Sequence, residues 1–138
     1  MEPLIIEATE KTPGIILDPY HDLFEISGIS RPENASEFYI PVINWLIEFE
    51  KEVLDRKAIK FDKKHPLNFK LKMNYFNSSS AKFLYDVMSK LVEFHKKGHI
   101  IRILWSFEKD DDDMKYAGEE MSELIEVPFQ FIETPFIE

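Results

Sequence analysis

The pattern of hydrophobic and polar residues is most regular in the middle of the chain, from Leu67 to Phe76. In this stretch apolar and polar residues alternate strictly, as Leu67, Phe69, Leu71, Met73 and Tyr75 against Asn68, Lys70, Lys72 and Asn74. Strict alternation predicts a β-strand with one buried side and one side that meets water. A sheet built from such strands is expected to carry its helices mainly on one face.

Two longer stretches have apolar residues at spacings of three and four, which predicts amphipathic helices. The first runs from Glu37 to Arg56, and the second runs from about Ser79 to Lys97. Pro41 fits an α-helix only near the first turn, so an irregular start is expected for the first helix. Gly98 is suited to the left-handed residue that ends the second.

Shorter apolar stretches predict the remaining strands, at Leu4–Ala8, Gly14–Leu17, Leu23–Ser27, His99–Phe107 and Val127–Ile132. The stretch His99–Phe107 is apolar on both faces, which predicts a central strand. Met114–Leu124 is expected to form a third helix, with Asp112 or Asp113 as its cap. The tail that follows holds Phe136 and Ile137, which either pack back on the domain or contact another chain.

These elements predict a single α/β domain over residues 1–138, with a mixed sheet of about five strands. The sequence has no internal repeat and no Gly/Ser linker, and its length suits one domain with a sizeable core. The strand–helix–strand unit from Leu67 to Phe107 is expected to pair its strands in parallel, with a right-handed crossover.

Charge and composition exclude several kinds of binding partner and several kinds of site. The formal net charge is −9, which disfavours nucleic acid and anionic membrane surfaces as partners. The chain has no cysteine, so disulfides and thiolate metal sites are excluded. It has neither a basic leader with a long apolar segment nor an apolar run of about 18 residues. We therefore expect a cytoplasmic protein.

A serine cluster, Ser78 to Ser80, stands between the alternating strand and the second helix, directly after Asn77. Serine hydroxyls at such a junction commonly cap the helix by accepting a hydrogen bond from one of its first N–H groups. The same free N–H groups and the positive end of the helix dipole also favour a phosphate there. Both interpretations, a capping residue and a phosphorylation site, are open on the residues alone.

The sequence gives less support to a catalytic or a metal-binding site. A serine nucleophile on a strand-to-helix turn needs flanking glycines, which Ser78 lacks, and His95 and His99 lie roughly 25 Å away along the helix. The acidic run from Asp110 to Asp113 lacks the spacing and the glycine of a calcium loop. The four histidines are scattered, and no glycine-rich phosphate loop exists. We predict a protein that is not an enzyme and that needs no metal or other cofactor.

Several segments together resemble the SiaC family of bacterial regulatory phosphoproteins. The stretch from Tyr75 to Lys82 is similar to the family's Tyr-Phe-Asn-Thr-Ser-Ser-x-Lys segment. Further similarities follow in order along nearly the whole chain: Arg31–Ala35, Phe38, Tyr39, Pro41, Trp45–Leu46, Gly98, Trp105, Asp112–Met114, Gly118–Glu120 and Pro128–Phe129.

The resemblance implies a fold like that of the STAS-type anti-sigma factor antagonists, and a role in partner switching. A kinase related to anti-sigma factors would phosphorylate the protein, and a PP2C-type phosphatase would remove the phosphate. The unphosphorylated form would bind an output protein, which is a diguanylate cyclase in characterised members. The phosphoacceptor falls on Ser78, where the family usually has threonine, and Ser79 is an adjacent alternative. Asn77, Ser79 and Ser80 would shape the helix start, and Lys82 would help to neutralise the phosphate.

The alternative from another class is a constitutive binding or scaffold module. In such a module the serine cluster would only cap the helix, and the charge at Ser78 would not change partner binding.

Overall fold

The structure is a computed structural model that describes residues 1–135. Three strands come first along the chain, and helices and strands then alternate. The elements are β1 (Leu4–Ile6), β2 (Gly14–Asp18), β3 (Leu23–Ser30), α1 (Ala35–Phe49), the π-helix η1 (Glu50–Leu54), β4 (Leu67–Phe76), α2 (Ser78–Lys96), β5 (Ile101–Glu108), α3 (Asp112–Leu124) and β6 (Phe129–Thr134).

The strands form one mixed sheet of six strands in the order β1-β2-β3-β4-β5-β6. Strands β1 to β3 pair antiparallel, and β3 to β6 pair parallel. The predicted α/β class and mixed sheet are confirmed, with one strand more than the approximate five. The parallel pairing of β4 with β5 is confirmed as well.

The prediction of a central position for the fifth strand was wrong, because β6 alone lies outside β5. Apolar residues on both faces of the segment were the reason for predicting a central position. Leu104, on the face without helices, is half-buried instead beside its register neighbours Lys70 and Gln130. Long polar side chains can cover an apolar neighbour with their stems, so no second helical layer is needed.

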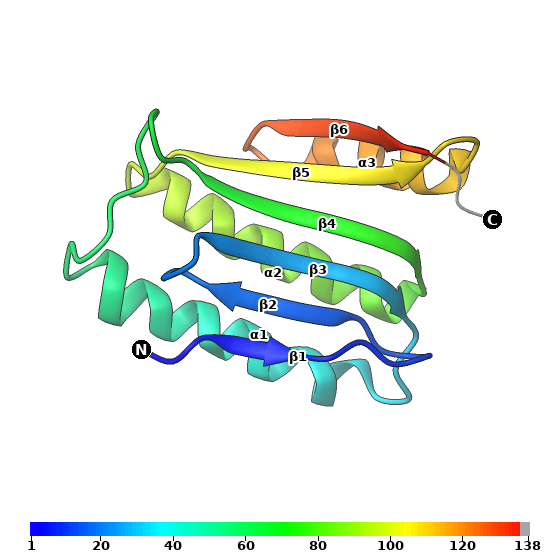
Figure 1. Ribbon diagram of the computed structural model, residues 1–138, viewed down its shortest axis with the longest axis horizontal. Coiled ribbons are helices and arrows are strands. Elements are labelled where there is room, and N and C mark those ends of the chain that lie inside the picture. Colours follow the sequence, from blue (N-terminus) through cyan, green and yellow to red (C-terminus); the bar gives the residue numbers. More distant parts are fainter. Residues whose placement is uncertain (136–138) are drawn as a thin grey trace.

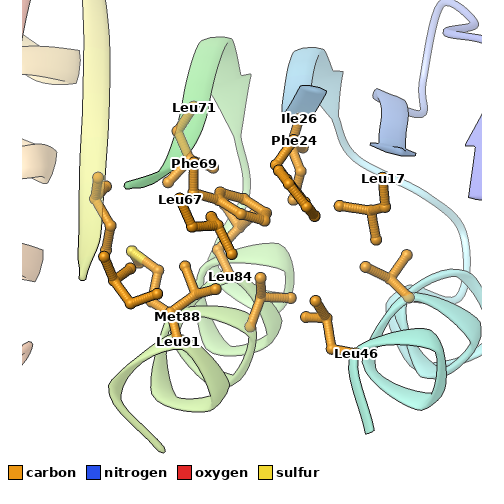
Figure 2. Packing of buried hydrophobic residues seen from close by; sticks show 14 of the residues in the cluster. Leu17, Phe24, Ile26, Leu46, Leu67, Phe69, Leu71, Leu84, Met88 and Leu91 are labelled. Atoms are coloured by element: carbon orange, nitrogen blue, oxygen red, sulfur yellow. The ribbon is translucent and has the colours of Figure 1, made fainter. Parts of the chain in front are cut away.

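All three α-helices lie on one face of the sheet, as predicted (Figure 1). Right-handed crossovers that advance in one direction across a sheet place their helices on the same face. The core fills the space between the two layers. In Figure 2, Leu17, Phe24, Ile26, Leu67, Phe69 and Leu71 of the sheet point toward Leu46 of α1 and Leu84, Met88 and Leu91 of α2.

The first helix begins two residues earlier than predicted and changes its winding near its end. The side chain of Asn34 caps α1 by accepting a hydrogen bond from the Glu37 N–H at 3.0 Å. Pro41 lies inside the helix beyond the first turn, contrary to the expected position. Proline has no backbone N–H, so the carbonyl of Glu37, four residues earlier, lacks its usual donor within the helix. Both residues are exposed, so water can donate to that carbonyl instead.

A bulge between β3 and β4 reverses the predicted alternation at the end of β4. The register shifts between Gly28 and Ile29, and Gly28 has a φ of 100°. Such a shift turns the following side chains over, so Tyr75 is 50% exposed although the alternation predicted its burial. Phe76 takes the inner position and packs edge-on against Trp105, with ring centroids 6.1 Å apart.

The other boundaries differ from the prediction by one to three residues, with the largest difference at the end of β3, which is Ser30 instead of Ser27. The cap of α3 is Asp111, which accepts from the Met114 N–H at 3.1 Å, because Asp112 and Asp113 already belong to the helix. Gly98 has a φ of 98° just after α2, as predicted. Strand β6 continues to Thr134, because β5 pairs with it as far as Glu108. Phe136 and Ile137 lie outside the described residues.

Candidate functional site

The serine cluster lies where β4 ends and α2 begins, at the carboxyl ends of the parallel strands. Only Asn77 separates the last residue of β4 from Ser78, which is the first residue of α2. The end of β5 lies at the same edge, since Asn74 of β4 donates a hydrogen bond to Glu108, the last residue of β5, at 3.3 Å. This edge is where α/β sheets commonly place their functional residues.

The cap of α2 is Asn77 rather than a serine. Its side-chain oxygen accepts a hydrogen bond from the Ser80 N–H at 2.9 Å, and its backbone is extended. Ser78 and Ser79 are both exposed. Because Asn77 performs the capping, neither of these two hydroxyls is needed to hold the helix start.

Ser80 differs from its two neighbours because it is fully buried in a chain of hydroxyl groups. The Ser30 hydroxyl donates to the Ser80 hydroxyl at 2.8 Å, and Ser80 donates to the Ser30 carbonyl at 3.1 Å. The Tyr39 hydroxyl lies 2.6 Å from the Ser30 hydroxyl. Each hydroxyl carries one hydrogen, so Tyr39 must donate to Ser30 for the chain to be satisfied.

This chain joins three elements, since Ser30 ends β3, Tyr39 belongs to α1 and Ser80 belongs to α2. Burial raises the pKa of the Tyr39 phenol, and its hydrogen bonds with Ser30 and Ser80 offset only part of that rise. The sequence interpretation missed Ser30 and Tyr39. Tyr39 lies three residues before Val42 on the apolar stripe of its helix, which was the available signal.

We expect Ser80→Ala to lower the free energy of unfolding by about 1–2 kcal/mol, because it leaves a buried hydroxyl of Ser30 without its acceptor. Ser79→Ala is the matched control, since Ser79 is exposed one residue away, and it should change stability by less than about 0.5 kcal/mol. Urea denaturation followed by tryptophan fluorescence measures both. Equal stabilities for the two variants would contradict the role given to the hydroxyl chain.

Lys82 lies in the first turns of α2 and is paired with an acid. Its amine is 3.1 Å from a carboxylate oxygen of Asp86, one turn further along, and 4.4 Å from the ring centroid of Phe83. Phe83 in turn stacks on Tyr39 at 5.7 Å. To neutralise a phosphate on Ser78, the Lys82 side chain would have to leave Asp86, an exposed i,i+4 pair of small energy.

The histidines do not approach the serine cluster. His95 lies in the last turn of α2 and His99 follows it, whereas Ser78 starts the same helix of 19 residues. A helix of that length spans about 28 Å, so neither of these two imidazoles can activate Ser78.

Within residues 1–135, no group of three or more His, Asp or Glu side chains is arranged to hold a metal ion. In the acidic run, Asp110 has a φ of 71°, and Asp111 is occupied as the cap of α3.

The fold and the site together define a layered α/β domain in which two exposed serine hydroxyls stand at the start of α2. The chain belongs to the SiaC family: the sequence model for the SiaC family regulatory phosphoprotein matches residues 6–134.

Individual relatives agree with this assignment. An uncharacterized protein of Pseudomonas aeruginosa (strain UCBPP-PA14) is 30% identical over 129 residues, covering 94% of this chain and 94% of that protein. The crystal structure of apo-SiaC from Pseudomonas aeruginosa matches with a TM-score of 0.78 and 30% identity, over 96% of this chain and 99% of that one.

A second solved structure is the diguanylate cyclase SiaD in complex with its activator SiaC, from the same organism. The match has a TM-score of 0.80 and 28% identity, and it covers 95% of this chain and 99% of the matched chain. The protein is thus a regulatory phosphoprotein of a family in which a homologue binds a diguanylate cyclase as its activator. Within the part of the chain that the structure describes, none of the helices is long and apolar enough to cross a membrane.

Proposed function

We propose that this protein is a phosphorylation-controlled partner switch that acts in the cytoplasm, with Ser78 as its phosphoacceptor. The observation that carries the proposal is that three residues at the start of α2 have different roles. Asn77 caps the helix, Ser80 is buried in the hydroxyl chain, and Ser78 remains as an exposed hydroxyl on the first helical residue.

A phosphate at this position would interact favourably with the start of α2. The first N–H groups of a helix have no partners within the helix, and the dipole places partial positive charge there. A phosphoserine adds about −1.5 to −2 charges. The fold would tolerate that charge, while a partner that contacts the start of α2 would meet an altered surface.

Membership of the SiaC family supports the partners that we propose. The proposed switch is phosphorylated by an anti-sigma-factor-like kinase and dephosphorylated by a PP2C-type phosphatase. The unphosphorylated form binds the output protein, and a diguanylate cyclase is the first candidate, because a homologue with the same fold is the activator of one. The protein itself carries out no chemistry in this scheme.

The acceptor is tested with purified protein, ATP and the kinase encoded in the same genome. We expect the wild type and Ser79→Ala to gain one phosphate, and Ser78→Ala to gain none, because only Ser78 combines exposure with the first helical position. Intact-mass spectrometry and peptide sequencing provide the measurement. Phosphate on Ser79, or on Ser78→Ala, would sink the assignment.

Partner binding separates the switch from a constitutive scaffold. Ser78→Asp and Ser78→Ala are compared for binding to the cyclase, with Ser79→Asp as a control for added charge one residue away. The switch requires weaker binding by Ser78→Asp than by Ser78→Ala. Equal binding by the two variants would favour a scaffold in which this position carries no signal.

A further inference from the structure

A pocket of about 450 Å³ lies at the opposite end of α2 from Ser78. It is lined by Leu54, Asp55, Lys57, Ile59, Lys60, Lys97 and His99, and we refer to it as the lysine pocket. The residues come from the end of η1, from the connection that follows it, and from the end of α2. The lining combines three amines and one carboxylate with two apolar side chains.

His99 is held rigidly in the wall of this pocket. Its side chain belongs to a residue that is only 5% exposed, and its ring meets that of Phe61 edge-on, with centroids 5.9 Å apart. The Phe61 N–H donates to His99 Nδ1 at 3.2 Å. A nitrogen that accepts this bond carries no proton in the neutral ring, so Nε2 carries the proton and is a donor.

That donor has no protein acceptor within residues 1–135. Every fully buried side-chain nitrogen or oxygen in the described residues has a hydrogen-bond partner. Nε2 has none, so it is not fully buried. His99 is one of the residues that line the lysine pocket, so a ligand bound there would lie next to this imidazole. Burial, reinforced by the nearby Lys60 charge, lowers the pKa of His99, which favours the neutral imidazole.

The lining of the pocket has more amine N–H donors than its single carboxylate can accept. The only carboxylate, Asp55, is engaged through both oxygens by the Lys97 amine, at 2.9 and 3.2 Å. Lys60 donates one of its three N–H groups to the Gly98 carbonyl at 2.8 Å. In the described part of the chain, neither Lys57 nor Lys60 has a carboxylate within ion-pairing distance.

Two unusual backbone positions lie beside these amines. Lys57 has a φ of 60°, an uncommon conformation for a residue with a side chain. Gly98 has no side chain where one would lie 3.2 Å from the Lys60 amine, so the amine can approach the backbone closely.

From this geometry we infer that the lysine pocket binds a small organic anion. Its carboxylate or phosphate group would accept hydrogen bonds from the amines of Lys57 and Lys60 and from His99 Nε2–H. A short apolar body would lie against Leu54 and Ile59. Charge-assisted hydrogen bonds from several donors to one anionic group are strong and directional. Lys57 and Lys60 are themselves exposed, whereas His99 is buried.

The site is independent of the proposed phosphosite, because α2 separates the two by about 28 Å. Nuclear magnetic resonance of the full chain tests it, with butyrate and inorganic phosphate as anionic probes and n-butylamine as a probe of similar size and opposite charge. We expect butyrate to shift the His99 Nε2 signal saturably and n-butylamine to leave it in place. Saturable shifts with inorganic phosphate as well would show that the anionic group alone is recognised, which also supports the site.

The Lys57→Met/Lys60→Met variant should weaken the response to butyrate about tenfold or more, because each amine contributes a charge-assisted hydrogen bond. Lys63→Met/Lys64→Met is the matched control in the same connection, and its affinity should equal that of the wild type. The backbone spectrum of each variant reports whether the fold is kept. The inference is overturned by an absence of saturable shifts in the wild type, or by equal affinities for the two double variants, in which case the amines only cover the helix ends.

Discussion

Phe49→Ala is expected to lower the free energy of unfolding by about 3–5 kcal/mol, the usual cost of removing a buried phenyl ring. Phe49 is fully buried at the end of α1. Its ring lies 5.1 Å from that of Trp45, 5.9 Å from Phe24, and 6.1 Å from Phe94. It therefore contacts α1, β3 and α2 together, and no neighbouring side chain is free to fill the cavity that alanine would leave.

A loss of this size is a large fraction of the 5–15 kcal/mol that stabilises a typical domain, and it corresponds to a fall in melting temperature of about 10–20 °C. Urea and thermal denaturation measure it. Tyr116→Ala is the control, since Tyr116 on α3 is 57% exposed, and its substitution should cost less than about 0.5 kcal/mol. A Phe49→Ala protein within about 1 kcal/mol of the wild type would contradict this account of the core.

The elements that the sequence predicts correctly are those whose signal lies within a single segment. The alternation from Leu67 to Met73 and the helical spacing of the α2 stripe each depend on one face of one element. Burial of that face determines the periodicity, so the pattern can be interpreted without knowing the neighbours.

The errors occur where a second segment decides the outcome. Tyr75 follows the alternation of β4, but the bulge that exposes it depends on the pairing with β3 at Gly28. Central and near-edge strands have the same composition, so β5 could not be placed without knowing where β6 pairs. At the starts of α2 and α3, several adjacent residues could each serve as the N-cap. Which of them does so depends on where the preceding segment ends.

The same distinction applies to the candidate sites. The serine cluster is evident in the sequence because the strand and the helix adjoin it directly. Ser80 differs from the two exposed serines because of Ser30 and Tyr39, which are 50 and 41 positions from it along the chain. The lysine pocket likewise combines His99 with lysines about 40 positions earlier, from a connection that had no predicted structure.

Gly118→Val is expected to lower the free energy of unfolding by about 3 kcal/mol, because α3 lies directly against Trp105 at this position. A Cβ atom on Gly118 would stand 2.5 Å from Trp105 Nε1 and 2.6 Å from Cδ1, well inside van der Waals contact. Trp105 cannot move aside easily, since it is almost fully buried and its Nε1–H donates to the Met114 carbonyl at 3.0 Å. Overpacking of this kind typically costs about 1–3 kcal/mol, and loss of the hydrogen bond adds about 1 kcal/mol.

The side chain that replaces Gly118 separates this contact from helix propensity. Glycine inside a helix is about 1 kcal/mol less favourable than alanine, so Gly118→Ala would be stabilising if Trp105 were not in the way. We expect Gly118→Ala to be destabilising, and less so in the background of Trp105→Phe, where the ring is smaller. A double-mutant cycle measured by urea denaturation gives the coupling between the two positions. A stabilising Gly118→Ala, or strict additivity with Trp105→Phe, would mean that α3 can shift outward on the sheet without cost, and that the close approach of Gly118 to Trp105 does not hold it there.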